Sequence, residues 1–172
     1  MISQLVKMRN ELNLTIEKLK ERTRERSDTI NQITIEPQTI YRRTYNSISI
    51  DDKTNFLRNT ALEAMRTYGT DTTKRMYFTK YHSNSPHEVS YCIAVPPESE
   101  GEYICKIPGL KAISFFHHRA YEDIPVAKNS LINYAEKNNI KLSGTFRSIY
   151  LEGPPQHKDK NRFITQLIAI IE

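Results

Sequence analysis

The chain has 172 residues, of which 38% are hydrophobic and 26% are charged, and it contains ten Tyr and six Phe. The aromatic content excludes an intrinsically disordered protein. A membrane protein is excluded as well, because the charge content is high and no stretch approaches the ~20 consecutive apolar residues of a spanning helix. The formal net charge is +5, of which residues 1–26 carry +3 through seven Lys and Arg against four Glu, so a uniformly basic nucleic-acid-binding surface is not expected.

Residues 2–26 are predicted to form one long helix. They contain no Gly or Pro, and Leu5, Leu12 and Leu19 recur every seven residues, with Ile2 and Ile16 at the complementary positions. Such a helix is marginal alone in water and must bury its apolar stripe against a partner. We expect residues 1–28 to form a coiled-coil segment that makes the protein a homodimer through residues 2–26. Packing of this helix against its own domain is the alternative.

Residues 29–172 are predicted to form one domain of strands and helices. The first strand runs from Ile33 to Tyr41 and is bent or interrupted at Pro37, which lacks a backbone N–H. Helices are expected at 52–68, ended by Gly69, and at 124–138, where Pro125 falls in the permitted first turn. The remaining strands are expected at 75–81, 89–95, 103–107, 110–118, 146–152 and 162–171.

The order strand, helix, strand, strand occurs twice, which indicates an internal duplication. Tyr45 lies between strand and helix in the first copy, and Tyr121 lies at the matching place in the second. We therefore predict an α+β fold in which two pseudo-symmetric βαββ repeats form one antiparallel sheet backed by two helices, preceded by the long N-terminal helix. A concave groove is expected between the repeats, on the free face of the sheet.

A resemblance to a known family rests on an ordered set of short motifs within residues 33–171. The sequence HHRAYE at 117–122 is similar to a strand ending His-x-Gly-x-Tyr-Glu, and Ser143-Gly144 and Ile149-Tyr150-Leu151 follow at similar places. FITQL at 163–167 is similar to Tyr-Leu-Thr-Glu-Ile, and the strand 88–96 similarly ends in Val-Pro. Together they resemble the gyrase-inhibitor-like domain, the effector-binding domain of bacterial transcription activators. That domain forms the C-terminal part of multidrug-sensing regulators of the mercury-resistance (MerR) family.

The resemblance implies a domain that binds a small molecule and dimerises through the helix before it. Three features differ from the family pattern. The family's DNA-binding winged helix-turn-helix is missing, so contact with DNA is expected only through a module that this chain does not contain. The motif glycine is replaced by Arg119, and the family's pocket carboxylates correspond to Ser148 and Gln166, which carry no charge. A neutral or weakly polar ligand is therefore expected in preference to a cation.

The candidate ligand-binding residues are aromatic groups with a few polar neighbours, as a flat amphiphilic ligand requires. Alternation along a strand places Ser148, Tyr150 and Glu152 on one face. Gln166 lies in an otherwise apolar strand, where an unpaired amide would be costly, and this favours a role in the site. The aromatic candidates could instead be ordinary core. The candidates are Tyr41, Tyr91, Phe115, Ser148, Tyr150, Glu152 and Gln166.

We expect the domain to bind a small amphiphilic or aromatic ligand between the repeats and to pass its occupancy through the N-terminal helix to a transcription apparatus. One alternative is a hydrolase of the same fold that uses Glu152 to activate water. Another is a protein-binding module that blocks a topoisomerase, as gyrase inhibitors do. An enzyme is the less favoured class, and no catalytic residue is assigned.

No metal or cofactor is expected. His117 and His118 are adjacent on a predicted strand, so they point to opposite faces and do not chelate together. Cys92 and Cys105 are too few for a disulfide framework and do not form a metal site. Because the N-terminus also lacks the apolar core of a signal peptide, a cytoplasmic protein is expected.

Overall fold

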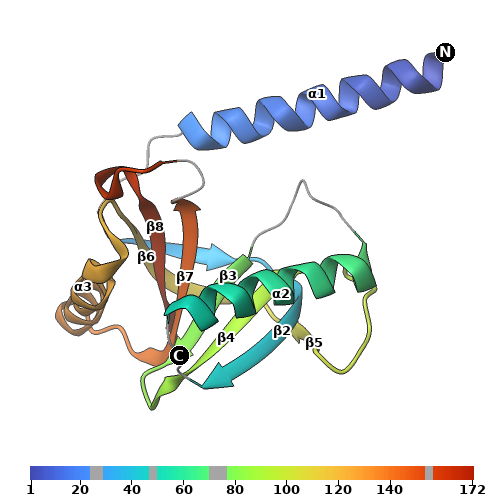
Figure 1. Ribbon diagram of the computed structural model, residues 1–172. Helices are drawn as coiled ribbons and strands as arrows, with labels where there is room; N and C mark the ends of the chain where they lie inside the picture. Colours follow the sequence, from blue (N-terminus) through green and yellow to red (C-terminus); the bar gives the residue numbers. More distant parts are fainter. Residues whose placement is uncertain (24–28, 47–49, 70–76, 154–156) are drawn as a thin grey trace.

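The computed structural model describes residues 1–23, 29–46, 50–69, 77–153 and 157–172. These residues form an α+β fold (Figure 1). Its elements are α1 (Ile2–Thr23), β1 (Asn31–Ile35), β2 (Gln38–Asn46), α2 (Ile50–Tyr68), β3 (Tyr77–His82), β4 (Ser85–Ala94), β5 (Ile104–Ile107), β6 (Leu110–His117), the 3-10 turn η1 (Tyr121–Asp123), α3 (Ile124–Lys137), β7 (Leu142–Glu152), the 3-10 turn η2 (Lys160–Arg162) and β8 (Ile164–Ile171).

The described strands belong to one antiparallel sheet in the order β1-β6-β8-β7-β3-β4-β2-β5. The first repeat is β2-α2-β3-β4 and the second is β6-α3-β7-β8. They meet at the pairing of β3 with β7, where Thr79 lies opposite Ser148. The predicted fold of two βαββ repeats joined edge to edge is confirmed.

Pro37 separates two strands that pair with different neighbours. The strand before it, β1, pairs with β6 of the second repeat, whereas β2 pairs with β4 and β5. The second repeat mirrors this arrangement, because β5 ends before Pro108 and pairs with β2 of the first repeat. A proline has no N–H for the ladder, which explains a break at each place. Each repeat therefore adds one strand to the edge of the other.

Both α2 and α3 pack on the same face of the sheet. Beneath α2, Ile93 packs with Ala64. Leu131 of α3 is fully buried and packs in the core of the second repeat. Replacing a leucine at such a site with alanine costs roughly 2–5 kcal/mol. The opposite face has its own buried cluster, which includes Ile40, Phe78, Cys92, Ile149 and Ile168.

Two glycines define local boundaries. Gly69 ends α2 with φ at +81°, and its N–H donates to the Met65 carbonyl oxygen at 3.1 Å, as expected of a helix-terminating glycine. Gly144, with φ at +88°, lies within β7, where the pairing with β8 shifts register between Leu142 and Phe146. The strand therefore begins at Leu142, four residues earlier than predicted, because a Ser-Gly pair that resembles a turn is accommodated as an irregularity.

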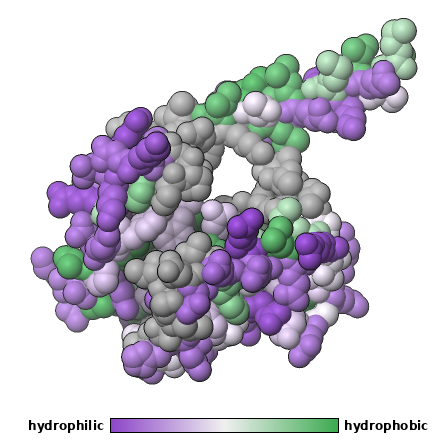
Figure 2. Space-filling model, in the orientation of Figure 1, coloured by the Kyte–Doolittle hydropathy of each residue, from purple (hydrophilic) through white to green (hydrophobic). Residues whose placement is uncertain are grey.

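Helix α1 carries its apolar stripe on the surface and lies apart from the sheet in Figure 1. Leu5 is 59% exposed and Leu12 is 61% exposed. Figure 2 shows hydrophobic surface along this helix. The alternative that the stripe is buried against the chain's own domain is therefore wrong. Within the described part of the chain, no helix is long and apolar enough to cross a membrane.

Candidate functional site

The candidate site is a strip of aromatic side chains on the helix-bearing face of the sheet, where the two repeats meet. Figure 1 shows α2 and α3 over different halves of the sheet, with β7 and β3 between them. The strip contains side chains from β2, β3, β4, β7, α2 and η1, and from the residue that precedes β8. We call it the interhelical aromatic strip, and its members are Tyr45, Phe56, Tyr77, Tyr81, Tyr91, Tyr121, Phe146, Tyr150 and Phe163.

At the α2 end, Tyr91 is held by stacking and by hydrogen bonds. Its ring stacks on Tyr45 with centroids 5.3 Å apart, and Phe56 of α2 lies 5.6 Å from it. The Tyr91 hydroxyl donates to the Lys53 carbonyl oxygen at 3.2 Å, so the Tyr45 hydroxyl is the donor in their 3.1 Å contact. Burial raises the pKa of Tyr91 above its usual range, and Tyr91 is 5% exposed. These contacts fix the position of the Tyr91 ring at this end of the strip.

At the centre, Tyr150 of β7 hydrogen-bonds weakly through its hydroxyl. Its contact with Thr79 Oγ1 is long, at 3.5 Å. Ser148, which is 1% exposed, contacts the phenols of both Tyr81 and Tyr150 and lowers their pKa values. Burial is nevertheless the dominant influence and raises both pKa values. Both phenols therefore stay neutral near pH 7, and Tyr150 has hydrogen-bonding capacity left for a ligand.

At the second-repeat end, Tyr121 of η1 covers the side of Tyr150. The ring centroids are 5.2 Å apart with planes at 67°, and Tyr121 also lies 5.0 Å from Phe163. Burial raises the pKa of Tyr121 to about 12. Gly153 makes room for this ring, because a Cβ atom there would overlap the Tyr121 hydroxyl. Tyr121 and Tyr150 therefore present two perpendicular aromatic surfaces at one place.

A lysine of α3 also reaches the strip. Lys128 Nζ lies 4.5 Å from the ring centroid of Phe146 and 5.0 Å from that of Tyr81, and these two rings stack on each other. Burial lowers the pKa of Lys128. Lys128 therefore places a positive charge beside these two rings of the strip. The ammonium already occupies aromatic surface that a ligand cation would use.

The structure brings three of the sequence candidates together. Tyr91, Ser148 and Tyr150 lie at the strip, on the helix-bearing face. The expectation that the groove lies on the free face of the sheet is therefore wrong for these residues, because the register at β3 and β7 places them on the same side as both helices.

The other aromatic candidates lie elsewhere on the helix-bearing face. Tyr41 lies near the end of α2, with its ring 5.8 Å from that of Tyr68. Phe115 is 8% exposed and belongs to the core beneath α3. The side chain of Glu152 lies outside the described residues, and β7 shifts its register between Tyr150 and Glu152.

Gln166 lies on the opposite face from Tyr150, and the expectation that the two share one site is wrong. Across the β7–β8 pairing, Tyr150 lies opposite Thr165 and Ile149 lies opposite Gln166. Gln166 Nε2 donates to Ser114 Oγ at 3.1 Å, which satisfies part of this amide. The polar residue in an apolar strand is thus explained by a hydrogen bond to the neighbouring strand.

Sequence reasoning missed Tyr121, Gly153, Phe163 and Lys128 as residues of the site. The sequence could have identified Tyr121 as a site residue, because Tyr121 belongs to the HHRAYE motif and to the internal repeat. The other three reach the strip only through the tertiary fold. In the described part of the chain, no group of three or more His, Cys, Asp or Glu could hold a metal ion.

Solved structures of other proteins match the fold of this chain, whereas sequence comparisons do not. No protein-family model matches the chain, and no curated protein matches it. The C-terminal domain of EcmrR superimposes with a TM-score of 0.75 at 21% identity, over 84% of this chain and 97% of that one. In a cryo-EM structure of an EcmrR–DNA complex, EcmrR matches 99% of this chain at 20% identity and a TM-score of 0.73. The match covers 68% of the EcmrR chain.

Two further solved structures have the same fold at lower identity. SAV2435, solved with tetraphenylphosphonium bound, matches with a TM-score of 0.54 at 13% identity, over 84% of this chain and 94% of that one. A hydrolase from Listeria innocua matches with a TM-score of 0.57 at 8% identity, over 91% of this chain and 98% of that one. The chain therefore has the fold of the EcmrR C-terminal domain, which confirms the fold that the sequence resemblance implied.

Proposed function

We propose that this chain is a small-molecule effector-binding domain of a bacterial transcription regulator, and that its ligand contacts the interhelical aromatic strip. The observation that carries the proposal is the perpendicular pair of Tyr121 and Tyr150 at the junction of the repeats. Neither ring is fully buried, and the hydrogen bond between the Tyr150 hydroxyl and Thr79 Oγ1 is long, at 3.5 Å. An aromatic ligand would stack on one ring, meet the edge of the other and hydrogen-bond to the phenol.

The fold of the relatives supports the same class of function. EcmrR has been solved in complex with DNA, and SAV2435 has been solved with a lipophilic cation bound. We propose that the present chain likewise acts in a DNA-binding regulator, with DNA contacted by a module outside these 172 residues. The match to the EcmrR–DNA structure covers almost the whole of this chain, which includes α1.

We propose that the ligand is neutral or anionic. A cation that entered the strip would lose hydration and would meet Lys128, which already lies over the rings of Phe146 and Tyr81. A neutral aromatic molecule avoids the repulsion, and an anionic group gains from the ammonium.

We further propose that α1 joins two copies of the chain. Leu5 and Leu12 are exposed on one stripe with a seven-residue repeat, and a helix with such a stripe is stable only when the stripe is covered. The second copy supplies an identical stripe. Ligand binding at one domain would then be communicated through the paired helices.

An enzyme is the second candidate function, and the structural match to a hydrolase from Listeria innocua supports it. A hydrolase would need a group that activates water, and Glu152 is the residue that the sequence offers. Wild type and Glu152→Gln should be assayed in parallel against aromatic esters. If the wild type hydrolyses the esters and Glu152→Gln does not, the enzyme is favoured. If the wild type does not hydrolyse them, the binding domain is favoured.

The proposed function is tested by titrating a neutral aromatic dye against the wild type and three variants. Tyr150→Ala should weaken binding at least about tenfold, because it removes the central ring. Tyr150→Phe should retain the stacking and lose only the hydrogen bond. The control is Tyr103→Ala, since Tyr103 is 37% exposed and lies outside the strip. Equal affinities for Tyr150→Ala and the wild type would contradict the proposal.

A further inference from the structure

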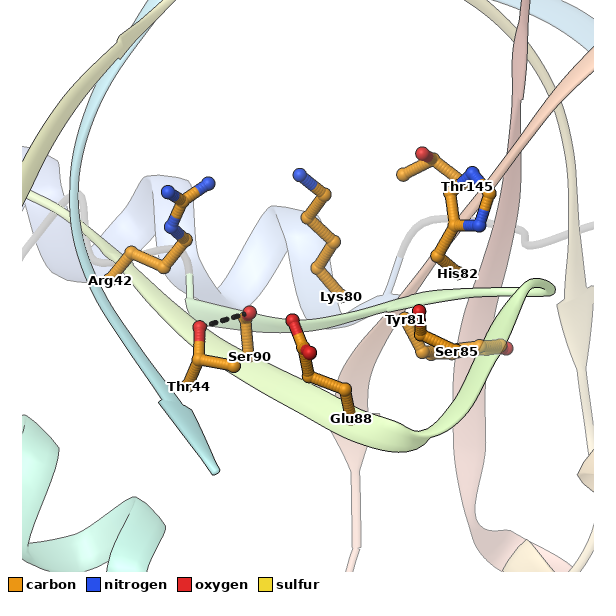
Figure 3. Close-up of a pocket in the computed structure, with 9 residues that line it drawn as sticks. All are labelled: Arg42, Thr44, Lys80, Tyr81, His82, Ser85, Glu88, Ser90 and Thr145. Carbon is orange, nitrogen blue, oxygen red and sulfur yellow. Dashed lines mark hydrogen bonds between the residues drawn. The ribbon is translucent and has the colours of Figure 1, made fainter. Parts of the chain in front are cut away.

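The face of the sheet opposite the helices carries a polar cavity of about 200 Å³ (Figure 3). Side chains from β2, β3 and β4 form most of its lining. Strand pairing places these side chains on one face of the sheet, because Thr44 of β2 and Lys80 of β3 each lie opposite Ser90 of β4. The cavity is lined by Arg42, Thr44, Lys80, His82, Glu88 and Ser90, among others.

Two half-buried cations, Arg42 and Lys80, line this cavity. Figure 3 shows Arg42 and Lys80 projecting to the same side of the sheet. Among the residues that the structure describes, no carboxylate forms an ion pair with either of them. Glu88 also lines the cavity, but it is exposed and lies beyond ion-pair distance of both. The cavity wall therefore carries a net positive charge.

A third cation lies beside them, in the interior. Arg147 is directly opposite Lys80 in the β3–β7 pairing and is 4% exposed. It lies over the ring of Phe78 and donates through Nη1 to Gln38 Oε1 at 3.1 Å, while its buried Nε has no hydrogen-bond partner. Burial raises the pKa of the Cys92 thiol to about 12, and the charges of all three cations act on that thiol in the opposite direction. The three positive charges are thus concentrated on one part of this face.

The remaining groups of the cavity supply hydrogen-bond donors. The hydroxyls of Thr44 and Ser90 are 2.7 Å apart, so one hydrogen joins them and the other is left to donate. His82 Nδ1 accepts a hydrogen bond from the Asn84 backbone N–H at 3.1 Å, so the neutral ring carries its proton on Nε2. Donors and unpaired cations together complement an oxyanion. The volume lies below the ~300–1,000 Å³ of sites for drug-sized ligands, which favours a compact group.

We propose that this cavity binds the phosphate or carboxylate group of a small anion, with Arg42 and Lys80 as its charge partners and the Thr44–Ser90 hydroxyl pair as a donor. The charge partners of the site lie on the face opposite the interhelical aromatic strip, because residues of β3 alternate between the two faces: Thr79 faces the strip and Lys80 faces the cavity. Tyr81 is the one strip residue that also lines the cavity. The proposal does not depend on ligand binding at the strip.

The test measures thermal unfolding of the full chain in sodium phosphate, sodium acetate and sodium chloride at equal ionic strength. Phosphate should raise the melting temperature with a saturable concentration dependence, beyond the effect of chloride, because only the folded state contains the site. A matching effect of acetate would support binding of a carboxylate group as well. Equal effects of phosphate, acetate and chloride would overturn the proposal.

Variants then locate the effect. Arg42→Met and Lys80→Met should each raise the apparent dissociation constant for phosphate by about tenfold to hundredfold, as expected for one charged hydrogen bond. Glu88→Gln should lower it, because a repulsive charge is removed. The matched control is Lys137→Met, since Lys137 is exposed at the end of α3. If Lys137→Met lost as much affinity as Lys80→Met, or if Glu88→Gln weakened binding, phosphate would be acting through general charge and the proposed site would be wrong.

Discussion

Tyr121 lies edge-on to Tyr150, with ring centroids 5.2 Å apart and ring planes at 67°. The pair joins the turn before α3 to the strand that links the two repeats, so its geometry depends on the packing of both. A change that displaces Tyr121 should therefore affect ligand binding even when no residue that contacts the ligand is altered.

Gly153→Ala is the most local way to displace Tyr121. The added Cβ would overlap the Tyr121 hydroxyl, so the ring must move away from Tyr150. We expect the free energy of unfolding to fall by roughly 1–3 kcal/mol and the affinity for a neutral aromatic dye to fall as well. Urea unfolding and dye titration measure the two effects.

Gly109→Ala is the control for that change. A Cβ at Gly109 would meet its nearest atoms at 3.6–3.8 Å, which is ordinary van der Waals contact, and Gly109 lies outside the strip. Dye affinity should stay at the wild-type value. If Gly153→Ala and Gly109→Ala bound the dye equally well, Tyr121 would not be part of the site.

Lys128 should control the charge preference of the strip. Lys128→Met removes the ammonium that lies over Phe146 and Tyr81, so a cationic dye should bind about tenfold more tightly while its neutral isostere changes little. Lys137→Met, on the same helix, should leave both affinities unchanged. Paired fluorescence titrations of the two dyes give the comparison, and an unaltered cation affinity in Lys128→Met would argue against the electrostatic explanation.

The phenols of the strip should make stability depend on alkaline pH. In the folded chain the pKa of Tyr121 is raised to about 12 from the ordinary value of 10.0. The unfolded state then loses this proton first, so the free energy of unfolding should be fully retained below pH ~10 and fall as the pH rises from about 10 to about 12. Tyr121→Phe should reduce this slope, measured by urea unfolding at several pH values. A slope equal to that of the wild type would show that Tyr121 does not carry the effect.

The exposed stripe of α1 predicts a dimer. Leu12→Asp places a charge in the middle of the stripe and should dissociate the dimer at micromolar concentration, as measured by light scattering. Asn13→Asp adds the same charge at a neighbouring exposed position outside the leucine repeat and should leave the dimer intact. A wild-type chain that is monomeric under the same conditions would refute dimerisation through α1.

Much of the fold could be predicted because local signals agree with the tertiary structure. Gly69 ends α2 as expected, and the repeated order of elements led to the two βαββ units. The exchange of β1 and β5 between repeats could not be predicted, because both prolines mark only a break and say nothing about which strand pairs beyond it. That information belongs to the tertiary fold.

The relation of Gln166 to Tyr150 shows why the site was only partly predicted. Alternation gives the two faces of each strand separately, but the match between faces of β7 and β8 depends on the register of their pairing. Strand β8 is buried on both sides, so its apolar run contains no alternation that could reveal its register. The actual register pairs Tyr150 with Thr165 and Ile149 with Gln166, so Gln166 faces the side of the sheet opposite Tyr150.

Contact between a neutral aromatic ligand and the perpendicular pair of Tyr121 and Tyr150 is the interaction on which the proposed function rests. The most direct test is a nuclear Overhauser measurement between ligand protons and assigned ring protons of the chain. We expect cross-peaks from the ligand to the rings of Tyr121 and Tyr150 and none to Phe78, which is 1% exposed on the opposite face. Cross-peaks to Phe78 without any to Tyr121 or Tyr150 would contradict the proposed function.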